Sequence, residues 1–230
     1  MMVRSMKIVV KLGGFAFQSE LELGIIKSYA NVFNELYEHN HKLVVVTGGG
    51  DNARKYIEAA RALGASEVTC DQIGIMVSRL NANLLIIALK DIAFPSIPKS
   101  IEELKDCFSF DKIVVMGGLQ PGQSTDAVAA IAAETIKADM LIYAKDVDGV
   151  YTSDPNKNQY AKKIEQVSIK KLLSLVIENK VWAGKYELID LVAIKLIERS
   201  KIPTWIISGL NAENIKKVLL GEHIGTKIIV

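Results

Sequence analysis

Short apolar runs alternate along the chain with longer stretches in which apolar residues recur at a period of about 3.6 residues. The runs are rich in β-branched residues, as in buried parallel strands. They predict strands at residues 7–12, 43–46, 113–116, 140–144, 204–207 and 227–230. The periodic stretches predict helices at residues 21–38, 52–63, 73–89, 101–106, 126–137, 188–200 and 212–220. This alternation predicts an α/β protein, a three-layer αβα fold with a mostly parallel central sheet.

The 230 residues are enough for one sizeable α/β core. No flexible linker interrupts the pattern, so we expect a single domain over residues 1–230, with lobes at about 1–137 and about 138–230. Two segments are loosely organised, residues 93–99 and residues 146–163. The second is polar and predicts a long loop or small hairpin, and such loops in compact domains often bind ligands.

Charge and composition limit the classes of partner that the protein is expected to bind. A net charge of +2 gives no global footprint for nucleic acid or membrane. The longest unbroken apolar stretch, residues 84–89, is far below the ~20 residues that span a bilayer. Cys70 and Cys107 have no metal-type spacing and are interpreted as reduced thiols. The N-terminus has no apolar signal region, so we expect a cytoplasmic protein that binds neither nucleic acid nor membrane.

Glycines follow three of the predicted strands. They form Lys11-Leu12-Gly13-Gly14, Thr47-Gly48-Gly49-Gly50 and Gly117-Gly118. Where a strand ends in glycines and a helix begins, free backbone N–H groups point at one spot and can bind phosphate. Several such turns at the carboxyl edge of one sheet predict a site for several phosphates. The alternative is that these glycines only make tight turns.

Two basic residues stand beside these turns. Lys11 ends the first predicted strand, where its ammonium could bridge phosphoryl oxygens, and Arg54 lies in the first turn of a predicted helix, a good place for a phosphate clamp. The alternatives are a strand-capping surface lysine and a solvated or salt-bridged arginine.

The segment Gly48–Ala53 also fits the dinucleotide fingerprint G-x-G-x-x-A. That interpretation is disfavoured because Asp71, the candidate ribose ligand, stands before a predicted helix instead of at the end of a strand. The P-loop motif and the protein-kinase signature set are absent from the sequence.

Two polar segments complete the candidate chemistry. Residues 118–126 form a donor-rich turn whose Ser124, Thr125 and Asp126 are natural helix caps, although the loop is longer than a cap requires. Residues 145–155 carry carboxylates and Tyr151, suited to ribose hydroxyls and a base. The three histidines lie outside the glycine motifs, and no catalytic Ser/His/Asp or Cys/His arrangement suggests itself.

With these motifs in this order, the chain resembles the amino-acid kinase family over essentially its whole length, and most closely the archaeal-type uridylate kinase branch. The motifs that carry the resemblance are 11–14, 47–50 with Ala53-Arg54, Asp71, 117–118 with 121–127, 147–151 with Asp154-Pro155, and Gly225-Thr226. The stretch 121–127, with Gly74 and residues 79–82, points to the uridylate branch.

The resemblance implies phosphoryl transfer from Mg²⁺-ATP to UMP, with Lys11 and Asp126 as the catalytic residues and Asp126 positioning Lys11. It implies an ATP site of Lys11, Leu12, Gly13, Gly14, Phe15, Gly50, Arg54, Lys145, Asp146, Tyr151 and Asp154 in which Mg²⁺ rides mainly on the phosphates. It implies a UMP site of Gly49, Asp71, Leu119, Gln120, Pro121, Gly122, Gln123, Ser124 and Thr125. It assigns UMP to the first lobe and ATP to the second. It also implies a homo-hexamer built as a trimer of dimers.

The chain departs from the family pattern at a few positions. Phe15 stands where a small or polar residue is common, Lys145-Asp146 replaces the usual Thr-Asn, and Asp190-Leu191 replaces a common Asp-Pro. Related kinases of acyl substrates often place a second lysine near Asp190, and the sequence assigns neither Lys185 nor Lys195 to that role.

Other functions remain open on the same fold. One alternative is a kinase of isopentenyl phosphate, carbamate or an amino-acid carboxylate. Another is a non-catalytic nucleotide- or oxyanion-binding protein, which the presence of both Lys11 and Asp126 disfavours.

Overall fold

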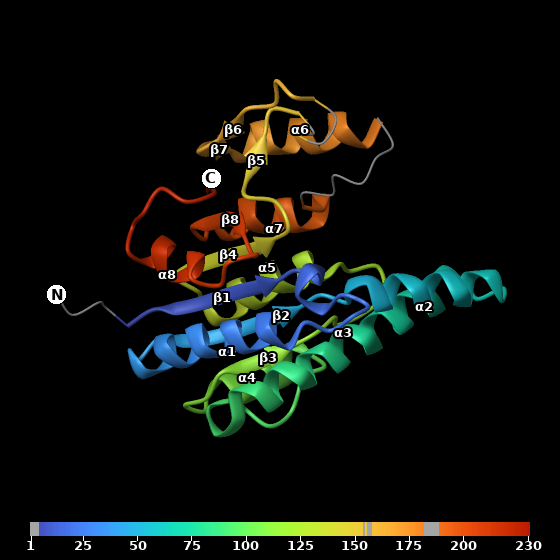
Figure 1. The fold of residues 1–230 in the computed structure, drawn as a ribbon, viewed down its shortest axis with the longest axis vertical. Helices are drawn as coiled ribbons and strands as arrows, with labels where there is room; N and C mark the ends of the chain where they lie inside the picture. Colours follow the sequence, from blue (N-terminus) through green and yellow to red (C-terminus); the bar gives the residue numbers. More distant parts are fainter. Residues whose placement is uncertain (1–4, 154, 156–157, 182–188) are drawn as a thin grey trace.

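The computed structural model describes residues 5–153, 155, 158–181 and 189–230. Its central layer consists of β1 (Lys7–Leu12), β2 (Lys42–Thr47), β3 (Val114–Met116), β4 (Met140–Lys145), β7 (Gln166–Ser168), β8 (Thr204–Ser208) and β9 (Thr226–Ile229). These strands form one sheet in the order β3-β2-β1-β4-β8-β9-β7 (Figure 1). Among the sheet neighbours only β8 and β9 are antiparallel. The prediction of a mostly parallel sheet is confirmed.

Helices cover both faces of this sheet. The buried residues on one face come from α1 (Leu23–Glu38), α3 (Glu67–Leu89) and α8 (Asn214–Leu219) together with the 3₁₀ turn η1 (Gly14–Phe17). Those on the other face come from α4 (Ile101–Phe108), α5 (Thr125–Ile136), α6 (Ile169–Val181) and α7 (Leu191–Ser200). The α2 helix (Gly50–Ala62) packs on α3 and projects away from the sheet (Figure 1). The predicted αβα layering is confirmed.

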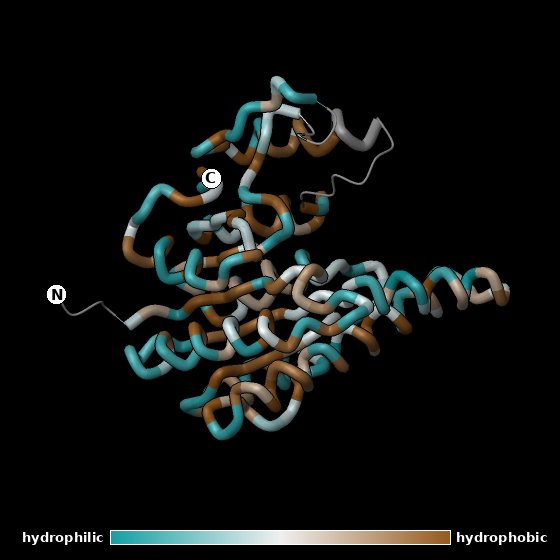
Figure 2. Tube along the Cα trace, in the orientation of Figure 1, coloured by the Kyte–Doolittle hydropathy of each residue, from teal (hydrophilic) through white to brown (hydrophobic). Residues whose placement is uncertain are grey.

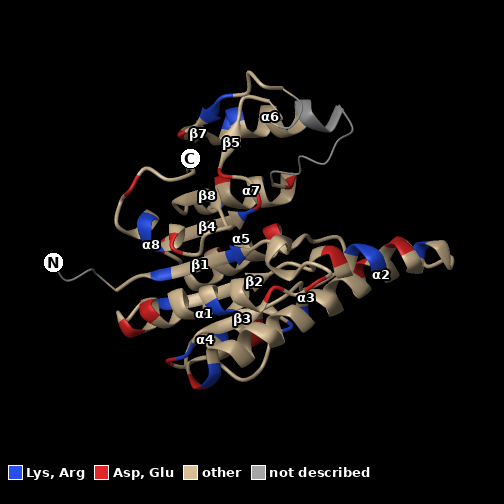
Figure 3. Cartoon of the chain, viewed as in Figure 1, with Lys and Arg blue, Asp and Glu red and all other residues tan. Residues whose placement is uncertain are grey.

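The alternation of side chains along the strands builds both halves of the core. In β1, Ile8, Val10 and Leu12 point into the cluster under α1, whereas Val9 points into the cluster under α5. Successive side chains of a strand face opposite sides, so an apolar strand fills two cores at once. Figure 2 shows the resulting apolar band along the central strands, and Figure 3 shows that most charged residues lie on the outer helices and the loops.

The structure corrects the predicted boundary of one helix. The α3 helix begins at Glu67, because Ser66 caps it by accepting a hydrogen bond from the backbone N–H of Thr69 (3.2 Å). Asp71 therefore lies inside this helix and not before it. Of the two alternatives for residues 146–163, a long loop or a small hairpin, the structure has the hairpin, formed by the antiparallel strands β5 (Val150–Tyr151) and β6 (Lys163–Ile164).

Some elements have no counterpart in the predictions, namely α6, β7, η1 and the 3₁₀ turn η2 (Lys90–Ile92). The apolar face of α6 is short, with Leu172, Leu175 and Val176 buried, and it follows a long polar segment directly. The strand β7 has three residues, too few for a periodic signal.

The segment Glu67–Ile92, which is α3 with η2, is long and apolar enough to cross a membrane by length and composition alone. This test is weak evidence, since core helices of soluble proteins also pass it. In this structure Ala82, Leu85 and Leu89 of α3 are buried against the sheet, whereas Met76 and Leu80 are exposed.

Candidate active site

The glycine turns meet at the carboxyl end of the central strands. β1 pairs with β2 on one side and with β4 on the other, and such a switch in strand order opens a crevice where ligands bind. The turns after β1 and β2 touch, because a Cβ on Gly14 would lie 2.9 Å from the Cα of Gly50. Gly50 has a φ of +66°, and a Cβ there would lie 2.0 Å from the carbonyl oxygen of Phe17. Only glycine fits this position without strain.

Three charged side chains form an ion cluster beside this crevice, the buried triad of Lys11, Asp126 and Lys145. Lys11 Nζ lies 3.0 Å from Asp126 Oδ1, and Lys145 Nζ donates a hydrogen bond to Asp126 Oδ2 at 2.6 Å. The three side chains are only 8%, 11% and 9% exposed. Two ammonium groups therefore share one carboxylate away from water.

Strand alternation explains why the two lysines converge. Lys11 follows Val9 on the α5 face of β1, and Lys145 follows Tyr143 on the same face of the neighbouring strand β4. Asp126 lies in the first turn of α5, whose N-terminus faces the ends of both strands. Tyr143 fixes that turn by donating its hydroxyl hydrogen to the Asp126 carbonyl oxygen at 3.0 Å.

The triad has distinctive electrostatics. Burial by itself would raise the pKa of Asp126, but the charges of Lys11 and Lys145 outweigh it and lower that pKa to about 2. Burial lowers the pKa of Lys145, and the Asp126 charge acts against that shift. Burial, together with Asp126 and Asp190, raises the pKa of Tyr143 well above its usual value. Asp126 is thus ionised at neutral pH, and the Tyr143 hydroxyl stays neutral as a donor.

A cavity of about 170 Å³ lies among α2, α3 and the start of α5. Its lining contains Gly49, Asp71, Gln123 and Thr125, all predicted for the UMP site, together with Ala53, Ile57, Gly74, Ile75, Ser78 and Gly118. Thr125 immediately precedes Asp126, so the cavity and the triad share the start of α5. Gln123 Oε1 is buried and has no hydrogen-bond partner within the described part of the chain.

The acceptor loop, residues 119–125, is held by α3 and by Asp190 at the start of α7. Asp71 accepts a hydrogen bond from the Gly122 N–H (2.8 Å), and Arg79 donates to the Leu119 carbonyl (3.2 Å). The loop also closes on itself through Gln123 N–H and the Gln120 carbonyl (3.3 Å), with Pro121 between them. Its last side chain but one, Ser124, caps α5 by accepting from the Ala127 N–H.

Ser124 also donates its hydroxyl hydrogen to Asp190 Oδ2, while Asp190 Oδ1 caps α7 by accepting from Val192 and Ala193. Two helix starts from distant parts of the chain are thereby tied together. The sequence left Asp190 without a role, and only the tertiary structure reveals this link.

Two residues that the sequence predictions did not name as site residues support the glycine turns. Ser78 Oγ accepts from the Gly118 N–H (2.9 Å), and Asn81 Nδ2 donates to the Gly48 and Gly49 carbonyls (2.8 and 3.1 Å). They share one face of α3 with Asp71 and Gly74, at helical spacing. That spacing along α3 was the feature of the sequence that could have identified Ser78 and Asn81 as site residues.

Several predicted ATP-site residues lie apart from the triad. Arg54 is exposed and pairs with Asp51 at 3.2 Å. Phe15 is buried in the α1-side cluster, where its ring packs against Gly209. Tyr151 donates to Asp148 at 2.7 Å on the β5–β6 hairpin. Their ATP-binding roles stay predictions.

The remaining predicted residues follow the strand ends. Leu12 has a buried side chain, and its carbonyl accepts from the Gly48 N–H at 2.9 Å. Gly13 donates its N–H to the Ala144 carbonyl at 2.9 Å, which leaves Gly14 as the next donor of that turn. Asp146 is exposed just beyond β4, and Asp154 lies outside the described residues.

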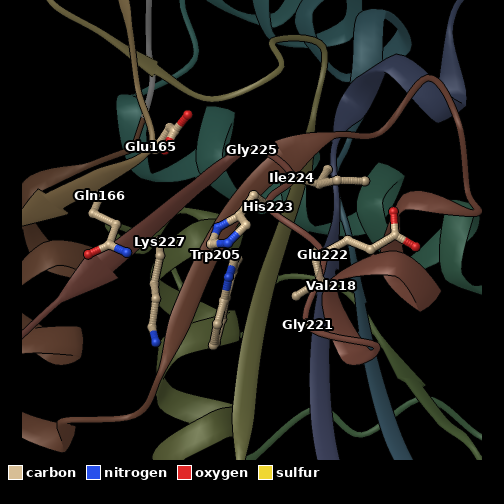
Figure 4. A pocket seen from close by; sticks show the side chains of 10 residues that line it. All are labelled: Glu165, Gln166, Trp205, Val218, Gly221, Glu222, His223, Ile224, Gly225 and Lys227. Atoms are coloured by element: carbon tan, nitrogen blue, oxygen red, sulfur yellow. The ribbon is translucent and has the colours of Figure 1, made fainter.

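A second cavity, of about 180 Å³, lies elsewhere in the fold. Its lining comes from Glu165, Gln166, Trp205, Val218, Gly221, Glu222, His223, Ile224, Gly225 and Lys227 (Figure 4). Lys227 Nζ lies 5.1 Å from the centre of the Trp205 ring. None of the predicted site residues that the structure describes lines this cavity, so it carries no part of the argument for the reaction.

Comparison with known proteins agrees with this geometry. The model of the amino acid kinase family matches residues 6–208. Uridylate kinases of Hyperthermus butylicus and Methanosarcina mazei are 47% and 46% identical, covering 96% and 94% of this chain and 97% and 93% of their own. The crystal structure of uridylate kinase from Archaeoglobus fulgidus superposes with a TM-score of 0.87 at 44% identity, covering 97% of this chain and all of that one. The chain therefore belongs to the amino acid kinase family, and the predicted resemblance to archaeal uridylate kinases is confirmed.

Proposed function

We propose that this protein transfers the γ-phosphoryl group of ATP to UMP, giving ADP and UDP. One observation carries the proposal: the start of α5 places Thr125 in the acceptor cavity and Asp126 in the buried triad. A phosphorylated acceptor in the cavity then sits beside the cations that would hold the transferring group. The uridylate kinases among the relatives support UMP as that acceptor.

The reaction does not require a general base from the protein. The UMP phosphate is largely dianionic at neutral pH, so its oxygen can attack without a general base. Positioning and charge stabilisation supply the catalysis in such transfers. Lys11 and the N–H group of Gly14 would offset the repulsion between two polyanions. Asp126 would hold Lys11 in place.

The buried Gln123 oxygen supports a uracil acceptor. A buried acceptor atom without a partner is costly, and a ligand N–H can satisfy it. Uracil carries such a donor at N3. The glycine N–H groups near Gly49 would take the UMP phosphate, and Asp71 would keep the acceptor loop closed through Gly122.

The ATP side of the proposal rests on the second lobe. Residues 1–137 would bind UMP and residues 138–230 would bind ATP, with Asp146, Tyr151 and Asp154 near the ribose and base and Arg54 near the phosphates. Mg²⁺ would arrive on the ATP phosphates and help neutralise their charge. Both oxygens of Asp126 already face lysines, and no group of three or more metal-ligating His, Cys, Asp or Glu occurs among the residues that the structure describes.

A homo-hexamer, a trimer of dimers in the cytoplasm, completes the proposal. Exposed apolar side chains along α3 (Met76, Leu80 and Ile87) favour self-association, because monomers rarely leave such rows uncovered. Light scattering of the purified protein tests the assembly, and a Leu80→Glu variant is expected to lower the mass. An unchanged mass would remove α3 from the interface.

The deciding experiment measures ADP release with Mg²⁺-ATP and a panel of UMP, CMP, AMP, GMP, isopentenyl phosphate and carbamate. Turnover with UMP far above the others is the expected result. Turnover with another acceptor would keep the fold but replace the acceptor. ATP binding without turnover on any acceptor would favour a nucleotide- or oxyanion-binding protein.

A further inference from the structure

The end of β4 carries the feature that the proposed function leaves unexplained. Lys145 is the last residue of this strand. Its side chain is 9% exposed and reaches the carboxylate that also holds Lys11. Burying a lysine is costly, so a second buried lysine on the same carboxylate calls for a purpose.

Among the residues that the structure describes, the buried charges in contact with Lys145 do not balance without a ligand. Lys11 and Lys145 bring two positive charges to one negative charge on Asp126, all three nearly buried. Asp146, the next acidic side chain in sequence, is exposed, where water screens its charge. A buried excess of positive charge is stabilised by an anion. The glycine turn after β1 follows Lys11 directly, and turns of this kind can bind phosphate groups.

We infer that Lys145 is a second catalytic lysine, whose ammonium contacts the phosphoryl group in transfer opposite Lys11. This inference rests on the proposed function. A UMP phosphate oxygen forms a bond to the γ-phosphorus as the bond to the β–γ bridging oxygen breaks, and the bonding electrons leave with ADP. No proton is transferred. The two lysines neutralise the charge on the equatorial oxygens of the moving group, and Asp126 sets the distance between them.

The geometry argues against the two simpler roles for Lys145. A ligand of the ATP ribose or base would belong with Tyr151 and the β5–β6 hairpin, whereas Lys145 Nζ turns to Asp126 at 2.6 Å. For charge alone a second partner of Asp126 is redundant, because Lys11 already lies 3.0 Å from Oδ1, although the hydrogen bond to the carboxylate comes from Lys145.

The test compares Lys145→Met with Lys145→Thr and measures kcat and KM separately for ATP and UMP. Both variants are expected to lower kcat about 10²-fold, with KM for ATP within about threefold, since a contact made in the transition state acts on kcat. A raised KM for ATP with an unchanged kcat would overturn the inference and return Lys145 to the ribose or base. Lys216→Met, which removes a paired lysine on α8, is the matched control and keeps the wild-type kcat.

A second measurement separates catalysis from structure. ADP with aluminium fluoride and UMP mimics the phosphoryl group in flight, and its affinity is expected to fall with kcat in Lys145→Met while ADP affinity holds. Equal losses of affinity for ADP and for the mimic would show that Lys145 is structural. The same conclusion would follow if Lys145→Met were unfolded at the assay temperature while Lys145→Thr kept the wild-type kcat. Wild-type turnover with UMP is measured first. If it fails, the proposed function fails, and binding of the mimic without UMP still tests Lys145.

Discussion

The molecule contains two ion triads of opposite construction. In the buried triad two lysines share Asp126, whereas in the surface triad Lys216 lies between Glu35 (2.6 Å) and Glu213 (2.7 Å). The distances are alike, but the two glutamates are about half exposed and the members of the buried triad are about one-tenth exposed. Geometry alone therefore does not distinguish an active-site cluster from an ordinary surface contact.

The environment and the sign of the charge make the difference. Water screens the surface triad, so its excess negative charge costs little and its pairs contribute little. The buried triad has a positive excess where the effective dielectric constant is low, so removing one partner leaves an uncompensated charge. The buried triad therefore calls for an anion. The predictions below test whether this contrast holds.

The largest effect is expected from Asp126→Asn. Both lysines then lose their carboxylate, so kcat should fall by roughly 10³-fold and the free energy of unfolding by about 3–5 kcal/mol. Steady-state kinetics and urea unfolding measure the two effects. Glu213→Gln makes the same carboxylate-to-amide substitution at an outer member of the surface triad and should leave kcat unaltered. Equal behaviour of the two variants would abolish the contrast.

The next effect is expected from Lys11→Ala. Turnover should fall about 10²-fold or more in a folded protein, because one preorganised charge contact contributes a few kcal/mol in the transition state. Circular dichroism establishes the fold, and the coupled assay gives kcat. Near-normal turnover would show that Lys11 only neutralises Asp126.

The sequence predicted most of the scaffold on which the buried triad stands. Apolar runs fixed the central strands to within a residue or two, because strands buried on both faces read as continuous apolar segments. Catalytic roles for Lys11 and Asp126 were predicted from the family resemblance and stay predictions. The place of Lys145 was not predicted, because the predicted strand ended at residue 144 and its alternation therefore did not extend to the lysine.

Contacts between distant segments could not be predicted from the sequence, for a related reason. The link from Ser124 to Asp190 spans 66 residues, and Ser78 reaches Gly118 across 40. Neither residue forms a local pattern with its partner. Periodicity reports which face of an element is buried, and it is silent on which loop that face will meet.

The pH dependence of the protein's stability in acid tests the charge of the buried triad. The pKa of Asp126 falls from 3.8 to about 2 on folding, so its ionised form stabilises the protein above pH 4. That contribution, on the order of 2 kcal/mol, is lost as the pH drops through about 2. Thermal unfolding between pH 2 and 6 should show a steeper acid limb for the wild type than for Asp126→Asn. Parallel curves would assign acid sensitivity to other carboxylates.

Loss of the hydrogen bond between Ser124 and Asp190 should have a smaller effect on stability. Ser124→Ala removes the cap of α5 and the bond to Asp190, and should lower the free energy of unfolding by about 1 kcal/mol. KM for UMP should rise more than kcat falls, because the acceptor loop loosens while the lysines stay in place. Ser124→Thr keeps a hydroxyl and should restore most of the affinity. A loss confined to kcat would connect this link to the triad itself.

The smallest effect is expected from Lys216→Met, which removes the centre of the surface triad. The two glutamates keep their water, so the melting temperature should change little and kcat should match the wild type. The residual difference should shrink further in 0.5–1 M salt, where the Debye length falls to roughly 3–4 Å. Differential scanning fluorimetry across a salt series measures it. A large, salt-independent loss would show that Lys216 is as deeply coupled as Lys145, and the contrast between the two triads would then rest on the sign of their charge alone.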